Sequence, residues 1–86
     1  MSKCIVHTSD GRRAQRWQFH RGYIVESMSG RYIGAAERDG RYWTVVYGQR
    51  EERQPYRYET LDHATRVLLE IDAQRTQMAR ALRGKS

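Results

Sequence analysis

Glycine-centred turn signals recur along the first half of the chain, and their regular spacing limits the possible folds more than any other feature. They stand roughly ten residues apart, as turns do between short consecutive strands. The segments between them contain many tyrosine, tryptophan and β-branched residues, which suit half-buried strands. The spacing therefore predicts an antiparallel β-meander. The four signals are Ser9-Asp10-Gly11, His20-Arg21-Gly22, Ser29-Gly30 and Asp39-Gly40.

The first two predicted strands span residues 3–8 and 14–19. A three-residue loop, His20-Arg21-Gly22, would end the second strand, with the glycine in the left-handed conformation that such loops need. This loop length sets the register of the next strand and therefore decides which side chains share a face.

The register that follows from a three-residue loop places Phe19 opposite Tyr23, with Trp17 on the same side of the sheet. Arg16 and Gln18 then point to the other side. We expect the aromatic side to form the core and the Arg16 and Gln18 side to face solvent.

The following hairpin carries an Asp39-Gly40 signal typical of a type I′ turn. That turn pairs Ala36 with Trp43 and Gly34 with Val45. The two small residues would leave a shallow seat on which a helix can pack. Tyr42 falls on the opposite, more polar side of the hairpin.

A single helix is predicted at the end of the chain. Thr60 is a good N-cap, and the helix should run from Leu61 to about Arg83 and stop at Gly84. Residues 56–59 before it would lie extended at the edge of the sheet, after Pro55. One apolar stripe follows the helix, formed by Leu61, Ala64, Leu68, Ile71, Met78 and Leu82.

These elements predict an α+β fold, an antiparallel four- to five-stranded β-meander with one long C-terminal α-helix packed on one face. Residues 1–86 would form a single domain, with the sheet in residues 1–59 and the helix in residues 60–83. The last third of the helix has few apolar residues. It would either project as a basic arm or form a homodimer seam through Met78 and Leu82.

The formal net charge of the chain is +6, and its basic residues concentrate at both ends. Almost all of them are arginine, a bias that GC-rich coding also produces. Their placement away from the acids is more informative, because two basic ends that met in the fold would form one surface attractive to phosphate. The end residues expected to contact phosphate are Lys3, Arg12, Arg13, Arg16, Arg21, Arg75, Arg80, Arg83 and Lys85.

Three other side chains complete the predicted binding surface. Gln18 and His20 are best placed for base edges or sugars, and Tyr42 is the most exposed candidate for base stacking. Together these residues favour a small non-catalytic basic protein that binds nucleic acid or a nucleoprotein complex. The sequence leaves open whether the nucleic acid is DNA or RNA.

An alternative is a protein inhibitor or adaptor whose arginines meet an acidic protein surface. A compact chain of this kind resembles, in size and style, the small accessory proteins of phages and other mobile elements. Some of those disable host defence complexes such as CRISPR. A small metal-dependent nuclease is a more remote alternative.

Several classes of function are not expected. Cys4 is the only cysteine, which excludes an intrachain disulfide and favours an intracellular, cytoplasmic protein. No apolar run could span a bilayer, so we expect no membrane partner. Cys4 and His7 point to opposite faces of a strand and cannot chelate one metal ion together. We therefore expect no metal, no cofactor and no enzymatic activity.

Overall fold

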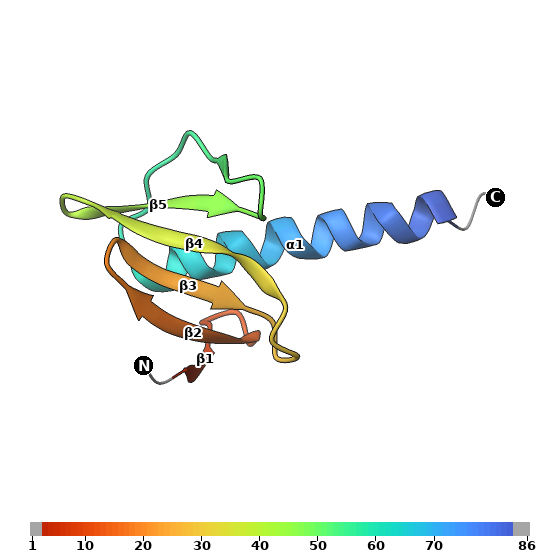
Figure 1. The fold of residues 1–86 in the computed structure, drawn as a ribbon, viewed down its shortest axis with the longest axis horizontal. Helices are drawn as coiled ribbons and strands as arrows, with labels where there is room; N and C mark the ends of the chain where they lie inside the picture. The colour runs from red at the N-terminus through yellow and green to blue at the C-terminus, as the bar shows by residue number, and fades with distance from the viewer. Residues whose placement is uncertain (1–2, 84–86) are drawn as a thin grey trace.

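The computed structural model describes residues 3–83 and confirms the α+β class. Consecutive strands pair antiparallel in one six-stranded sheet, and one helix crosses a single face of it (Figure 1). The meander has one short strand more than the largest number predicted. Its elements are β1 (Cys4–His7), β2 (Arg13–Phe19), β3 (Gly22–Glu26), β4 (Tyr32–Asp39), β5 (Tyr42–Tyr47), β6 (Glu52–Arg53) and α1 (Leu61–Arg83).

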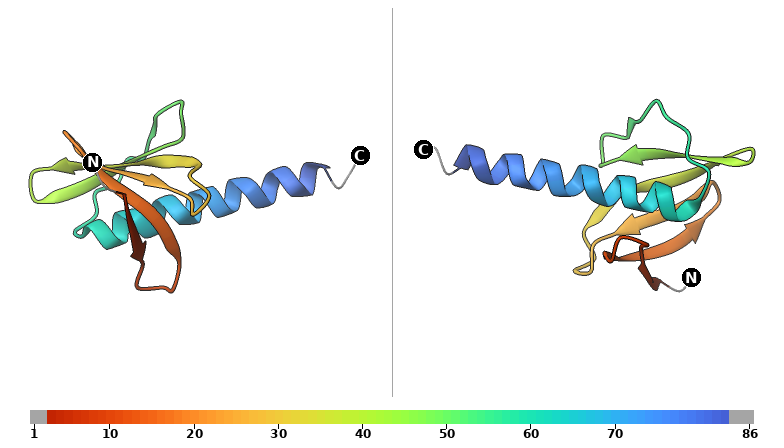
Figure 2. Two further views of the ribbon diagram at one scale, coloured as in Figure 1. Left: turned by 60° about the horizontal axis from the view of Figure 1, so that its bottom comes forward. Right: turned by 180° about the vertical axis from the view of Figure 1, so that it is seen from behind.

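The core lies between the sheet and the first three turns of α1. Figure 2 shows the helix running along one face of the sheet. The Thr60 hydroxyl accepts a hydrogen bond from the backbone N–H of His63 at 3.0 Å, which confirms the predicted N-cap. Before the helix, Tyr58 forms a bridge to Trp43 at the sheet edge. Fully buried side chains from strands and helix meet in this layer, among them Ala14, Val25, Ala36, Val45, Ala64 and Leu68.

Gly34 confirms the predicted seat for the helix. A Cβ atom at Gly34 would lie 2.3 Å from the Val46 carbonyl oxygen and 2.7 Å from Leu68 Cδ2. Both distances are far below normal contact. The helix therefore approaches β4 closely because this position has no side chain.

The predicted register of the β2–β3 hairpin is wrong by one residue. The loop has two residues, His20 and Arg21, and Phe19 pairs with Gly22. A one-residue shift moves every side chain to the other face. Arg16 and Gln18 accordingly lie on the helix side of the sheet, and Trp17 lies on the side away from it.

A close approach between strands explains why Gly22 stands inside the strand. A Cβ atom there would lie 2.1 Å from the carbonyl oxygen of Ala36 on β4. The glycine is therefore needed for contact with β4, and its φ of +156° also favours glycine, although the residue stands in the strand and not in the loop.

The predicted register of the β4–β5 hairpin is also wrong, by two residues. Its turn is Gly40-Arg41, Ala36 pairs with Val45, and Arg38 pairs with Trp43. A shift of two residues preserves the faces, so the small residues still meet the helix. Gly40 has a φ of +62°, which favours glycine at the start of the turn.

The second half of α1 extends past the sheet (Figure 1). Met78 and Leu82 on this projecting part are 62% and 72% exposed. The molecule measures 46 × 28 × 24 Å, and β1, an edge strand of the sheet, lies away from the C-terminal end of the helix (Figure 1). The expected convergence of the two basic ends is therefore wrong. Within residues 3–83, no helix has the length and apolarity needed to cross a membrane.

Candidate nucleic-acid interface

The meander gives the sheet two ends with different surroundings. We call the end formed by residues 8–12, 27–31 and 48–51 the loop end; the helix leaves the sheet there (Figure 1). The opposite end carries the His20-Arg21 and Gly40-Arg41 turns and the start of α1, and we call it the hairpin end. The arginines at the two ends have different partners.

At the loop end, arginines bind carboxylates on the helix. Arg31 holds Asp72 through two hydrogen bonds of 3.0 and 2.8 Å, and Tyr47 donates a third at 3.1 Å. The Arg31 guanidinium holds the pKa of Asp72 below its ordinary value. Arg12 forms ion pairs with Glu70 and with Asp10. The charges of these arginines are therefore largely neutralised.

Ion pairs also occupy two other residues expected to contact phosphate. The Lys3 ammonium lies 2.7 Å from Glu26, which lowers the pKa of that carboxyl group. Arg75 lies 3.0 Å from Glu52, with its guanidinium 5.5 Å from the centre of the Tyr47 ring. Lys3, Arg12 and Arg75 thus contact protein carboxylates, which reduces their availability to an external anion.

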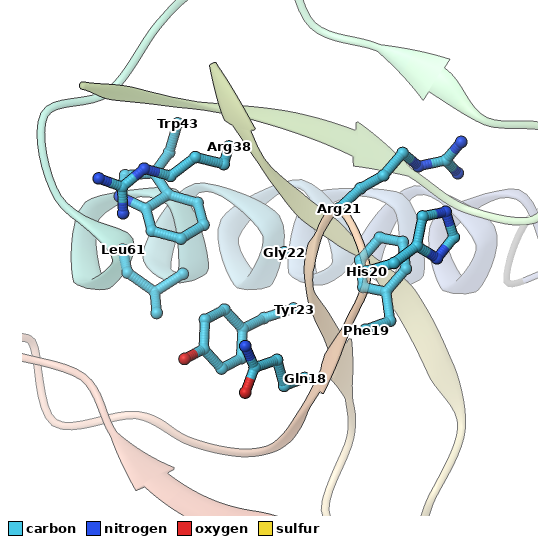
Figure 3. A pocket seen from close by; sticks show the side chains of 9 residues that line it. All are labelled: Gln18, Phe19, His20, Arg21, Gly22, Tyr23, Arg38, Trp43 and Leu61. Carbon is cyan, nitrogen blue, oxygen red and sulfur yellow. The ribbon is translucent and has the colours of Figure 1, made fainter. Parts of the chain in front are cut away.

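The hairpin end contains a shallow cleft of about 290 Å³ between the β2–β3 turn, the β4–β5 hairpin and the first residue of α1. Figure 3 shows the side chains around it. Tyr23, Trp43 and Leu61 form its apolar part, with Gln18 and Arg38 beside them, while Phe19, His20 and Arg21 project on the other side of the β2–β3 hairpin. The lining residues are Gln18, Phe19, His20, Arg21, Gly22, Tyr23, Arg38, Trp43 and Leu61.

Two arginines at this end stack on aromatic rings. The Arg38 guanidinium lies 5.1 Å from the centre of the Trp43 ring, and the Arg16 guanidinium lies 5.0 Å from that of Tyr23. The two ring centres are 6.0 Å apart. The four side chains thus form a row in the order Arg16, Tyr23, Trp43, Arg38, which we call the arginine–aromatic row.

The hydrogen bonds of the two arginines go to neutral groups. Arg38 donates to the carbonyl of Gly40 at 3.0 Å, and Arg16 donates to the hydroxyl of Thr65 at 3.3 Å. Among the residues that the structure describes, neither arginine has a carboxylate partner. Neither charge is balanced by an ion pair in this part of the chain.

Arg21, at the rim of the cleft, is partly neutralised. Its guanidinium lies 3.1 Å from the Glu37 carboxylate, and the Arg53 guanidinium lies 2.7 Å from the same carboxylate. One carboxylate therefore faces two guanidinium groups, and this small cluster retains positive charge.

The structure brings together some of the predicted binding residues and separates the others. Gln18, His20 and Arg21 line one cleft, and Arg16 lines the adjoining groove next to Leu61. The remaining residues lie elsewhere: Arg13 on the sheet face away from the helix, Tyr42 beside Arg41 and Glu59, and Arg80 on the projecting helix. The side chain of Arg83 and the whole of Lys85 lie outside the described part of the chain.

Tyr23, Arg38 and Trp43 belong to the cleft but were not predicted as site residues. The correct strand register would have identified them, because Gln18 pairs with Tyr23 and Arg38 pairs with Trp43. Two-residue turns at His20-Arg21 and at Gly40-Arg41 would have placed these side chains together on the helix side.

Comparisons with protein-family models, with curated proteins and with solved structures found no match to this chain. Across residues 3–83, no group of three or more His, Cys, Asp or Glu side chains could hold a metal ion. The assignment of a function therefore depends on the geometry of the hairpin end.

Proposed function

We propose that the protein binds nucleic acid, without cleaving it, through the cleft and the arginine–aromatic row of the hairpin end. The observation that carries this proposal is the pair of unneutralised arginines, Arg16 and Arg38, held against two aromatic rings beside exposed polar side chains. Most other arginines in the described chain are tied to carboxylates, so these two are the main unbalanced charges at the cleft.

The chemistry of the row suits a phosphate chain. A guanidinium group offers a planar fork of donors to phosphate oxygens and can stack on a base at the same time. Binding would release counterions from the nucleic acid, and its affinity would fall as salt concentration rises. Gln18 and His20, exposed at the rim, would contact base edges or sugars.

The test compares two double variants of equal charge change. Arg16→Gln with Arg38→Gln removes the free charges of the row but keeps polar side chains of similar stem length. Arg50→Gln with Arg80→Gln removes the same charge from two exposed sites that have no carboxylate partner in the described chain. Binding is measured by fluorescence anisotropy with labelled DNA and RNA single strands of about 15 nucleotides, which would cover a single small binding fold.

We expect the row variant to lose about tenfold or more in affinity, equivalent to about 1.4 kcal/mol, and the control to lose much less. Equal losses in both variants would mean that only net charge matters, and the cleft assignment would be wrong. The oligonucleotide should be recovered intact on a denaturing gel after incubation with Mg²⁺, since the proposed role is binding alone.

A protein partner is the second candidate, favoured by the projecting half of α1. Met78 and Leu82 are largely exposed there, on a segment with arginines and no acidic residue after Asp72. An adaptor or inhibitor could place this helix against an acidic protein or nucleoprotein surface. Two copies could also pair through Met78 and Leu82, and sedimentation measurements on the intact chain would then give a dimer.

A further inference from the structure

We infer that the cleft holds one unpaired base of a single-stranded nucleic acid, with the backbone phosphates bound by the arginines at either end of the row. This inference rests on the proposed function and adds the class of nucleic acid and the way in which it is held.

The inner part of the cleft matches the flat, apolar face of a base. It is formed by Tyr23, Trp43 and Leu61, which come from β3, β5 and the start of α1 (Figure 3). Trp43 is 9% exposed and belongs to the core, so it closes the floor of the cleft. Tyr23 and Leu61 are half-buried and form the part of this surface that is open to a ligand. Stacking of a base on an aromatic side chain contributes about 1–3 kcal/mol and tolerates any base.

The rim of the cleft matches the polar edge of a base. The Gln18 amide can both donate and accept hydrogen bonds, and the His20 imidazole can do the same in its neutral form. Both side chains are exposed and belong to the lining of the cleft. Gln18 lies beside Tyr23, while His20 packs against Phe19 on the other side of the hairpin (Figure 3). An apolar floor with an amide group beside it suits a nucleobase better than a carboxylate side chain, which has no apolar face.

Positive charges flank the aromatic part of the row. Arg16 and Arg38 occupy opposite ends of the row, with Tyr23 and Trp43 between them. A single strand that crosses the cleft along the row would pass both guanidinium groups, and each of them can bind a phosphate of its backbone. In a duplex the bases are stacked and paired, so none could reach the inner part of the cleft without first leaving the helix.

Tryptophan fluorescence offers a direct test, because the chain has only two tryptophans on opposite faces of the sheet. Trp17→Phe leaves Trp43 as the sole emitter. This variant is titrated with an oligonucleotide of about 15 thymidines, with an abasic strand of equal length and with a duplex of equal length. Anisotropy of the labelled strands gives the affinity in parallel.

We expect saturable quenching of Trp43 by the thymidine strand, little quenching by the other two ligands, and about tenfold weaker binding of the abasic strand. Equal affinity for thymidine and abasic strands without quenching would overturn the inference, while the proposed function would stand. Absence of binding to all three ligands would overturn both.

The wild-type chain supplies a second measurement that does not depend on the stability of the variant. Protein labelled with 5-fluorotryptophan has one ¹⁹F resonance for each tryptophan. The Trp43 resonance should shift with the thymidine strand while that of Trp17 stays in place. A shift confined to Trp17 would put the bound strand on the other face of the sheet and would contradict the inference.

Discussion

The two ends of the sheet use the same residue type for different purposes. At the loop end, Arg12 and Arg31 bind carboxylates of the helix and tie it to the loops. At the hairpin end, Arg16 and Arg38 stack on aromatic rings and meet no carboxylate in the described chain. The role of an arginine in this protein therefore depends on whether a carboxylate of the helix or of the sheet lies within its reach.

The helix links the two ends, so displacing it should have the largest effect. Gly34→Ala would place a methyl group against the Val46 carbonyl and the Leu68 side chain, and we expect a loss of about 2–3 kcal/mol in the free energy of unfolding. Urea denaturation followed by circular dichroism measures this loss.

Gly30→Ala is the matched control for that substitution. Gly30 has a φ of +89° and open space around it, so an added methyl group strains only the local backbone. We expect a loss of about 1 kcal/mol. Equal losses at the two glycines would mean that the close seat on β4 does not hold the helix.

Asp72→Asn should separate stability from binding. It removes the negative charge that binds Arg31 and weakens the oxygen that accepts a hydrogen bond from Tyr47. We therefore expect a loss of about 1–2 kcal/mol in the free energy of unfolding. Affinity for single strands should stay the same or increase slightly, because Arg31 becomes free. The Arg16→Gln, Arg38→Gln variant should show the opposite pattern, with weaker binding and nearly unchanged stability.

Acid should weaken the loop end first. The pKa of Asp72 is lower in the folded protein than in the unfolded chain, because Arg31 binds its charged form. The contribution of Asp72 to the free energy of unfolding is therefore complete above the ordinary aspartate pKa. It is lost as the pH falls through the lowered pKa of the folded state. Stability measured against pH should fall less steeply in Asp72→Asn than in the wild type. Identical acid profiles would show that this ion pair does not contribute.

Removal of the projecting helix should have the smallest effect. A chain that ends at Thr76 keeps the Arg75–Glu52 ion pair and loses the exposed Met78 and Leu82. We expect a melting temperature within a few degrees of the wild type, since the removed segment buries little surface. If sedimentation shows a dimer of the full chain and a monomer of the shortened one, the homodimer seam is supported.

The fold could be predicted from local signals. These signals are the turn spacing, the Thr60 cap and the small residues that face the helix. Each depends on residues close together in the chain, and the structure confirms each of them. The length of the His20-Arg21 loop could not be decided in this way. It depends on how closely Gly22 approaches Ala36, a contact with a strand that comes later in the sequence.

The one-residue difference in the length of this loop explains most of the difference between the predicted and observed sites. The one-residue shift turned Arg16 and Gln18 toward the helix side, where Tyr23 and Trp43 join them. The ion pairs could not be predicted from the sequence for a related reason. Charge counted along the sequence does not show that Glu70 and Asp72 lie against the loop-end arginines.

The salt dependence of binding tests the central claim most directly, because it counts phosphate contacts. On single strands each contact adds about 0.7 to the slope of log affinity against log salt. We predict that Arg16→Gln with Arg38→Gln lowers the wild-type slope by about 1.4, and that Arg50→Gln with Arg80→Gln leaves it nearly unchanged. A slope that falls equally in both variants, or only in the control, would contradict the assignment of nucleic-acid binding to the hairpin end.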